Sequence, residues 1–203
     1  MKKNKISKNW INRQRRDIYV RKSKVEGYRS RAVYKLEEIN QKFNIFYNGA
    51  SVLDLGAAPG SWSQYISKNY KNIKLVSIDL NKFDQIENTF QIIGDFTENI
   101  YKQKILNFFK GKIDIVISDM AVNTTGNKNL DSIQTSELCL DAMRFSKEVL
   151  KKNGTFVSKI FIGSTFNEII DESKKIFKKN KVFKPSASRK ESKESFIVCG
   201  VLR

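Results

Sequence analysis

Two charged residues lie in or directly after segments that the sequence predicts to be buried strands. Lys159 stands inside the apolar run FVSKIF, and Asp119 directly follows IDIVIS. A charged amine is costly in an apolar strand unless it faces a site that uses it, so we expect Lys159 to point into one. The chain contains no histidine, which excludes Ser-His-Asp and Cys-His catalysis. A lysine with a lowered pKa is then the natural proton acceptor, and Asp119 would orient it.

The segment SVLDLGAAPGSW, residues 51–62, has the form of a buried strand followed by a glycine-rich turn and a helix. Such a turn after the first strand of a parallel sheet is where many α/β proteins bind ligands. A dinucleotide fingerprint counted from Gly56 would need glycine at the positions that hold Ala58 and Ser61. The turn therefore predicts a nucleoside ligand without phosphates.

Carboxylates end the next two predicted strands. Asp79 closes VSID and Asp95 closes IIGD. Taken alone, an aspartate at a strand end is more often a helix cap. Because both follow the glycine-rich turn in order, we expect Asp79 to bind ribose hydroxyls and Asp95 to bind the exocyclic amine of adenine.

Strand and helix signals alternate along the chain, which predicts an α/β fold with a mostly parallel sheet covered by helices on both faces. The final connection is short, so the last strand is expected to be antiparallel. The expected strands are 51–56, 74–80, 90–94, 113–118, 154–161, 181–184 and 195–202, and the expected helices are 29–42, 61–70, 98–109, 130–151 and 164–179.

The formal net charge of +17 indicates a polyanionic partner, either nucleic acid or an acidic membrane surface. Residues 1–35 hold thirteen basic and two acidic residues, with three tyrosines among them. Aromatic rings among cations suit RNA, although a targeting segment would also be basic and poor in acidic residues. We expect residues 1–27 to form a basic arm and residues 28–203 to form a single catalytic domain.

The two cysteines, Cys139 and Cys199, are isolated within apolar runs. This spacing predicts core packing rather than a disulfide framework or a metal site. No apolar stretch approaches the roughly 20 residues that span a bilayer, and no secretory signal is evident. The sequence therefore predicts an intracellular protein with no bound metal and no membrane association.

Five blocks, in order along almost the whole chain, resemble the FtsJ family of S-adenosylmethionine-dependent rRNA 2′-O-methyltransferases. The similarity runs from about Arg16 to the C-terminus, through YRSRAVYKLEEI, VLDLGAAPGSWSQY, ISDMAVNTTG, GTFVSKIF and SRKESKESFIV. The resemblance implies a Rossmann-like fold with a seven-stranded sheet and S-adenosylmethionine as the cofactor. The chain departs from the family pattern at Ser61, where glycine is frequent, and at Val122, where proline is frequent.

The resemblance also implies roles for individual residues. Lys35 and Glu194 are assigned by the resemblance alone, and they complete a catalytic tetrad of Lys35, Asp119, Lys159 and Glu194. The implied cofactor-binding residues are Gly60, Ser61, Trp62, Asp79, Asp95 and Asp119.

Within the family, the segments KVEGYRSR, NTTGNKNLD and ASRKES look most similar to mitochondrial members, which modify a uridine of large-subunit rRNA. The resemblance thus implies a monomeric, mitochondrial or otherwise organellar enzyme whose substrate is rRNA within a large-subunit particle. A bacterial-type enzyme with the same chemistry in another compartment is one alternative, and a cytoplasmic or nucleolar location is the alternative to an organellar one. A tRNA or mRNA-cap 2′-O-methyltransferase and a catalytically idle, rRNA-binding assembly factor are the others, although an intact tetrad argues against the last.

Overall fold

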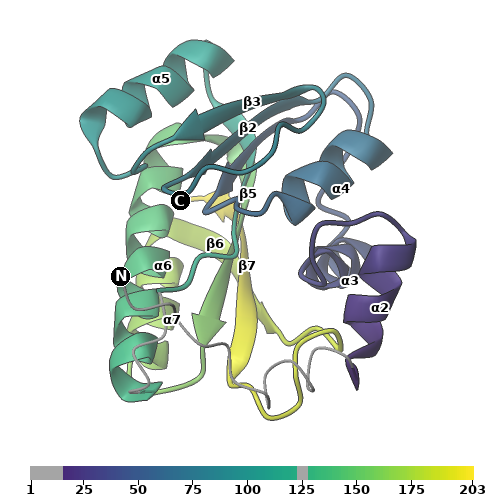
Figure 1. Cartoon of the computed structure of the whole chain (residues 1–203). Coiled ribbons are helices and arrows are strands. Elements are labelled where there is room, and N and C mark those ends of the chain that lie inside the picture. The colour runs from purple at the N-terminus through teal and green to yellow at the C-terminus, as the bar shows by residue number, and fades with distance from the viewer. Residues whose placement is uncertain (1–15, 123–127) are drawn as a thin grey trace, which may run out of the picture.

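The structure is a computed structural model that describes residues 16–122 and 128–203 of the chain (Figure 1). The helices in these ranges are α2 (Ile18–Val25), α3 (Val33–Phe43), α4 (Ser61–Asn69), α5 (Asn99–Phe109), α6 (Lys128–Val149) and α7 (Phe166–Ile176). The strands are β1 (Ser51–Leu55), β2 (Lys74–Asp79), β3 (Thr89–Ile93), β4 (Ile113–Ser118), β5 (Leu150–Phe161), β6 (Phe177–Phe183) and β7 (Glu194–Leu202). None of these helices is both long enough and apolar enough to cross a membrane.

All seven strands belong to one sheet, in the order β3-β2-β1-β4-β5-β7-β6. The neighbours from β3 to β5 run parallel, and β7 runs antiparallel to both β5 and β6. The predicted fold class is therefore confirmed, including the antiparallel last strand. The direction of chain crossing reverses between β1 and β4, and in open α/β sheets ligands bind beside the carboxyl ends of the strands at such a switch point.

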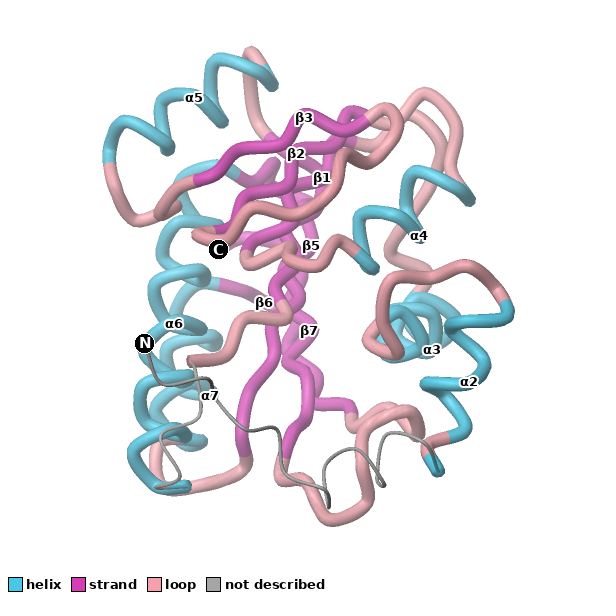
Figure 2. Tube along the Cα trace, in the orientation of Figure 1, coloured by secondary structure: helices cyan, strands magenta, loops and turns pink. Residues whose placement is uncertain are grey.

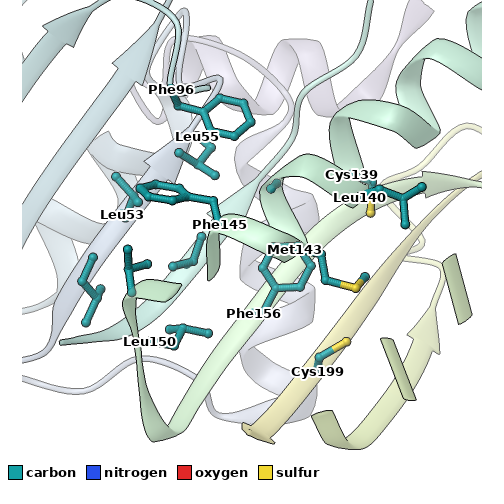
Figure 3. Packing of buried hydrophobic residues seen from close by; sticks show 14 of the residues in the cluster. Leu53, Leu55, Phe96, Cys139, Leu140, Met143, Phe145, Leu150, Phe156 and Cys199 are labelled. Carbon is teal, nitrogen blue, oxygen red and sulfur yellow. The ribbon is translucent and has the colours of Figure 1, made fainter. Parts of the chain in front are cut away.

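Helices cover both faces of the sheet (Figures 1 and 2). One buried cluster joins the sheet to α3 and α4, and the other joins it to α5, α6 and α7. In the second cluster, Met143 and Phe145 of α6 pack in the same layer as Leu53 and Phe156 of the sheet (Figure 3). Apolar residues on both sides of each strand explain why the strands read as continuous hydrophobic runs.

The two cysteines lie in this second cluster, as Figure 3 shows. Cys139 of α6 and Cys199 of β7 are buried free thiols. The core packing predicted for them is confirmed.

Apart from shifted ends of α3, α6 and β5, the structure differs from the predicted elements in the following ways. The helix predicted over 164–179 ends at Ile176, and β6 begins at Phe177. The sequence of β6, FKKNKVF, carries a weak strand signal, and pairing with β7 decides its conformation. Residues 18–25, part of the predicted arm, form α2, which begins after Asp17 because that carboxylate accepts hydrogen bonds from the Tyr19 and Val20 amides.

Candidate active site

The four residues of the predicted tetrad come together at the carboxyl ends of β4 and β5. Asp119 follows β4, Lys159 lies on β5, and Glu194 is the first residue of β7. Lys159 pairs across the sheet with Phe196, which is buried on the α3 side. Directly opposed residues share a face, as do residues two apart, so Lys159 and Glu194 both project toward α3. Lys35 reaches them from the first turn of that helix.

Within this four-residue cluster, cations and carboxylates alternate. The Lys159 Nζ donates to the Asp119 Oδ1 at 2.9 Å and to the Asp119 main-chain oxygen at 2.6 Å. The Lys35 Nζ donates to the Glu194 Oε2 at 2.8 Å and lies 3.7 Å from the Asp119 Oδ2. Each side chain is less than one-fifth exposed. This alternation offsets the cost of burying four charges in one place.

Electrostatics distinguish the members of the cluster. Burial opposes ionisation of Asp119, but the ammonium groups of Lys159 and Lys35 hold the pKa of this carboxyl below its usual range. Burial also opposes protonation of Lys35, yet the carboxylates of Asp119 and Glu194 raise the pKa of its amine above the ordinary value. Lys35 therefore remains a cation at neutral pH, which suits it to hold a charge rather than to accept a proton.

A cavity of about 490 Å³ opens beside the cluster, at the carboxyl ends of the central strands. We call it the main cavity; its volume lies within the roughly 300–1,000 Å³ typical of small-molecule sites. Asp79, Asp95 and Asp119 supply carboxylates to its wall, and most of the remaining lining is apolar, including Ile78, Leu80, Phe96, Met120, Val122 and Leu138. An apolar wall with several carboxylates suits a nucleoside that carries positive charge.

The two predicted nucleoside-binding aspartates are each fixed by local hydrogen bonds. Asp79 accepts from the Ala58 amide at 2.9 Å and from the Asn81 amide at 2.7 Å. Asp95 accepts from the amide and hydroxyl of Thr97 at 2.9 and 2.7 Å. Both aspartates therefore cap local turns, the structural role that an aspartate at a strand end often has. An ionised carboxylate has about four acceptor positions, so both residues can still accept bonds from a ligand in the cavity.

Three other predicted cofactor residues do not line the main cavity: Gly60, Ser61 and Trp62. Trp62 is buried, and its indole Nε1 donates to the Ala32 carbonyl at 2.8 Å. The Ser61 hydroxyl lies 2.5 Å from that of Ser30. These contacts bind the start of α4 to the segment before α3. Ser61 and Trp62 also line a small cavity that Asp119 shares, so their predicted role toward the cofactor stays a prediction.

Glycine is required at two positions of the turn between β1 and α4. Gly56 has a φ of 72°, and a Cβ there would lie 2.1 Å from the Met120 side chain. Gly60 has a φ of 97°, and a Cβ there would lie 2.6 Å from the Ile86 side chain. Both conformations disfavour other residues, and both positions lack space for a side chain. The glycines therefore allow the backbone of the turn to pass close to the side chains of Met120 and Ile86.

A second cavity, of about 340 Å³, borders the same cluster. Lys35 and Glu194 line it, together with Arg31 and Arg189, whereas Asp119 lines the main cavity. A small cavity of about 40 Å³ shares residues with both. The cluster is thus placed to act on two molecules that approach from different cavities.

Sequence reasoning missed Asp54, in the middle of β1. Its side chain is buried, lines the small cavity, and accepts a hydrogen bond from the Ser63 hydroxyl at 2.6 Å. Burial raises the pKa of the Asp54 carboxyl to about 7; the Ser63 hydrogen bond opposes this shift, and Asp119 and Asp79 add to it. The argument that singled out Lys159, a charged residue within an apolar strand, would have found Asp54 too.

Two arginines of the segment before α3 are bonded to the protein itself. Arg29 donates to three main-chain oxygens, those of Pro59, Asp84 and Gln85. Arg31 pairs with the Asp17 carboxylate and donates to the Ala187 carbonyl. The sequence predicted that this basic region contacts RNA, but these two guanidinium groups already serve internal contacts.

Comparison with known proteins identifies the class first. A crystal structure from Plasmodium falciparum, described as a ribosomal RNA methyltransferase, superposes with a TM-score of 0.77 at 34% identity. The alignment covers 86% of this chain and 98% of that one. The fold is thus that of an α/β methyltransferase. The chain belongs to the FtsJ-like methyltransferase family, whose model matches residues 28–202.

Curated relatives match 95% or more of the chain. A protein of Pelagibacter ubique named Ribosomal RNA large subunit methyltransferase E is 65% identical over 203 residues, which are 100% of both chains. A protein of the same name from Rickettsia bellii is 47% identical over 199 residues, covering 95% of this chain and 87% of the other. The predicted family is confirmed. Both relatives are bacterial, so they give no support to the mitochondrial assignment.

Proposed function

We propose that the protein transfers a methyl group from S-adenosylmethionine to the 2′-hydroxyl of a uridine in large-subunit ribosomal RNA. The names of its relatives support the substrate class. The observation that carries the chemistry is the 2.9 Å contact of Lys159 with Asp119, because Asp119 lines the main cavity while the same cluster borders the second. A methyl donor in one cavity and a ribose in the other would meet at this contact.

The residues of the main cavity fit S-adenosylmethionine. When bound, this cofactor supplies an activated methyl group on a cationic sulfonium. Three carboxylates in an apolar wall favour a cation, and Asp79 and Asp95 would accept hydrogen bonds from ribose hydroxyls and the adenine amine. The lining apolar side chains would exclude water around the adenosine.

Four side chains would divide the work on the RNA ribose. Lys159 would accept the proton of the 2′-hydroxyl at its Nζ, and Asp119 would orient that amine. Lys35 remains protonated, since its pKa is raised, and would donate a hydrogen bond to a ribose oxygen. Glu194 fixes Lys35 and borders the second cavity, where the nucleotide would lie.

The test is transfer of a tritiated methyl group from S-adenosylmethionine to purified large-subunit particles and to naked rRNA, followed by mapping of ribose methylation. We expect one 2′-O-methyluridine in large-subunit rRNA. A methylated base, or a preference for tRNA or capped mRNA, would contradict the proposal. Cofactor binding without transfer to any of these RNAs would favour the idle assembly factor.

The organellar location stays a prediction from the resemblance. The bacterial relatives favour the alternative, a bacterial-type enzyme with the same chemistry. Mass-spectrometric detection of the protein in fractionated source cells would decide between them.

A further inference from the structure

Cations without a carboxylate partner gather on strand β6, at the edge of the sheet. Its lysines Lys178, Lys179 and Lys181 are all exposed. Among the residues that the structure describes, no carboxylate lies within 4.0 Å of these three amines. They contrast with Arg29 and Arg31, whose guanidinium groups are bonded internally.

Two of these lysines face the same side of the sheet as α3. Lys179, Lys181 and Phe183 alternate along β6, and they lie opposite Gly200, Val198 and Phe196 of β7. Directly opposed residues share a face of the sheet. Val198 and Phe196 belong to the buried cluster on the α3 side, so Lys179 and Lys181 project from that face.

Helix α3 ends at Phe43 and leaves a groove at this corner of the sheet. The groove has a volume of about 430 Å³ and lies between Phe43 and Ile45 on one side and residues 178–181 on the other. Gly200, which has no side chain, is one of its lining residues. No acidic residue lines it. The groove is therefore a positively charged hollow.

The ring of Phe43 lines this groove, and the ring of Phe183 contacts Phe43. The Lys42 Nζ lies 4.4 Å from the centre of the Phe183 ring, and the Phe43 ring meets Phe183 edge to face at 5.8 Å. Lys42 is thereby held beside the two β6 lysines. We call this set of five residues the distal surface: Lys42, Phe43, Lys179, Lys181 and Phe183.

The distal surface extends away from the four-residue cluster: Phe183 pairs with Phe196, which also pairs with Lys159, whereas Lys179 pairs with Gly200 at the far end. Glu194 and Gly200 lie at opposite ends of the same strand, and six residues of extended chain span about 20 Å. A single nucleotide bound at the cluster could not reach Lys179, which lies opposite Gly200. A ligand that touches both the cluster and this lysine must be longer than one nucleotide.

We propose that the distal surface binds the phosphate backbone of ribosomal RNA outside the target nucleotide. This proposal rests on the proposed rRNA substrate. Lysine amines are compact charges that suit phosphates rather than particular bases, and aromatic rings accept stacked bases or riboses. Lysines on an edge strand also prevent sheets from pairing edge to edge. That role does not account for a third lysine and two rings on the neighbouring helix and strand end.

The test compares the full-length protein with the double variant Lys179→Gln/Lys181→Gln. The control is Lys104→Gln/Lys147→Gln, which removes the same charge from exposed positions on α5 and α6, on the opposite side of the sheet. Binding of a large-subunit rRNA transcript is measured at several salt concentrations. Each lost phosphate contact lowers the salt slope by about one, so the test variant should lose about two units of slope and bind roughly tenfold more weakly.

A second probe separates the distal surface from the cluster. A uridine dinucleotide has a single phosphodiester and is too short to bridge the cluster and the two β6 lysines, so it should bind the wild type and the test variant equally. Equal transcript binding by the two double variants would overturn the proposal, and so would a test variant that binds RNA normally but aggregates, since this indicates edge protection only. Failure of the proposed function would give a different result. The wild type would bind the transcript and the test variant would bind it more weakly, but neither protein would transfer a methyl group.

Discussion

Lys35 and Lys159 share the carboxylate of Asp119 but differ in their other neighbours. Lys35 lies between two carboxylates, and both raise the pKa of its amine. Lys159 has a single carboxylate and a main-chain carbonyl within hydrogen-bonding distance. In the proposed reaction this difference assigns the proton acceptor to Lys159 and the fixed positive charge to Lys35.

Substitution by arginine distinguishes these two roles. Arginine keeps the positive charge but does not lose its proton in a protein. Lys159→Arg should therefore abolish methyl transfer, with a loss on the order of 10²–10⁴-fold, while cofactor and RNA affinities change little. Lys35→Arg should retain more activity, because its charge is preserved. Single-turnover rates would measure both effects, and an active Lys159→Arg variant would show that Lys159 only positions the ribose.

Asp54 makes folding stability depend on pH. The pKa of its carboxyl is about 7 in the folded protein, against an ordinary value of 3.8, so the folded state binds more protons than the unfolded chain between these values. The stability contributed by this raised pKa is present at low pH and is lost as pH rises toward 7. Asp54→Asn should therefore gain stability relative to wild type from pH 5 to pH 8, by up to roughly 3 kcal/mol.

Urea denaturation of both proteins at the two pH values measures this difference. Other titrating groups contribute equally to both proteins, so they cancel in the comparison. A stability difference that does not change with pH would mean that Asp54 titrates normally in the folded protein.

At the scale of elements, Arg29 joins three parts of the site. Its guanidinium donates to the Pro59 carbonyl in the turn after β1, and to the carbonyls of Asp84 and Gln85 in the loop after β2, at 2.8 to 3.0 Å. The same residue precedes α3, which carries Lys35. The segment before α3 therefore holds the two loops that lead into the main cavity.

Removing these hydrogen bonds should loosen the cofactor site and leave RNA binding unchanged. Arg29→Gln is expected to weaken S-adenosylmethionine binding by about tenfold, which corresponds to about 1.4 kcal/mol, close to the net contribution of one hydrogen bond from a charged group. Arg29→Lys should not restore it, because one ammonium cannot reach three separate carbonyls. Arg21→Gln, at an exposed position of α2, is the matched control. Calorimetry gives the affinities, and a weakened salt slope with normal cofactor binding would make Arg29 an RNA ligand instead.

For the whole molecule, the positive charge is divided between regions with different tasks. Residues 1–15 contain six basic residues and no acidic one. From Asp17 onward the chain is part of the folded domain: Asp17 pairs with Arg31, and the ring of Tyr19 packs on Tyr34 at 5.4 Å. The boundary between arm and domain was expected at residue 27. The residues from Asp17 up to this boundary are instead packed on the domain.

Two truncations test this division. Deletion of residues 1–15 should preserve thermal stability and cofactor affinity, and should make RNA binding less dependent on salt. Deletion of residues 1–27 should also lower the melting temperature, because α2 and the Asp17–Arg31 pair are lost. An unchanged salt slope in the shorter deletion would indicate that residues 1–15 serve targeting rather than RNA binding.

The sequence by itself determined the fold class and most of the site. Buried strands between amphipathic helices are a local pattern, so the sheet and its helices could be predicted from periodicity. Lys159 and Asp119 could be recognised because a charge in or beside an apolar strand is costly without a function. The glycine-rich turn was recognisable because only glycine tolerates the backbone of Gly56 and Gly60.

The tertiary structure decided which residues meet. Lys35 and Glu194 are 159 positions apart, and only the packing of α3 on β7 brings them within 2.8 Å. Arg29 belongs to a segment expected to bind RNA, but long-range hydrogen bonds to the carbonyls of Pro59, Asp84 and Gln85 bond it to the protein itself. The local sequence shows where a charged residue would be energetically unfavourable within a buried strand or helix. Which group a long side chain bonds to depends on elements that are distant in the chain, so it could not be predicted.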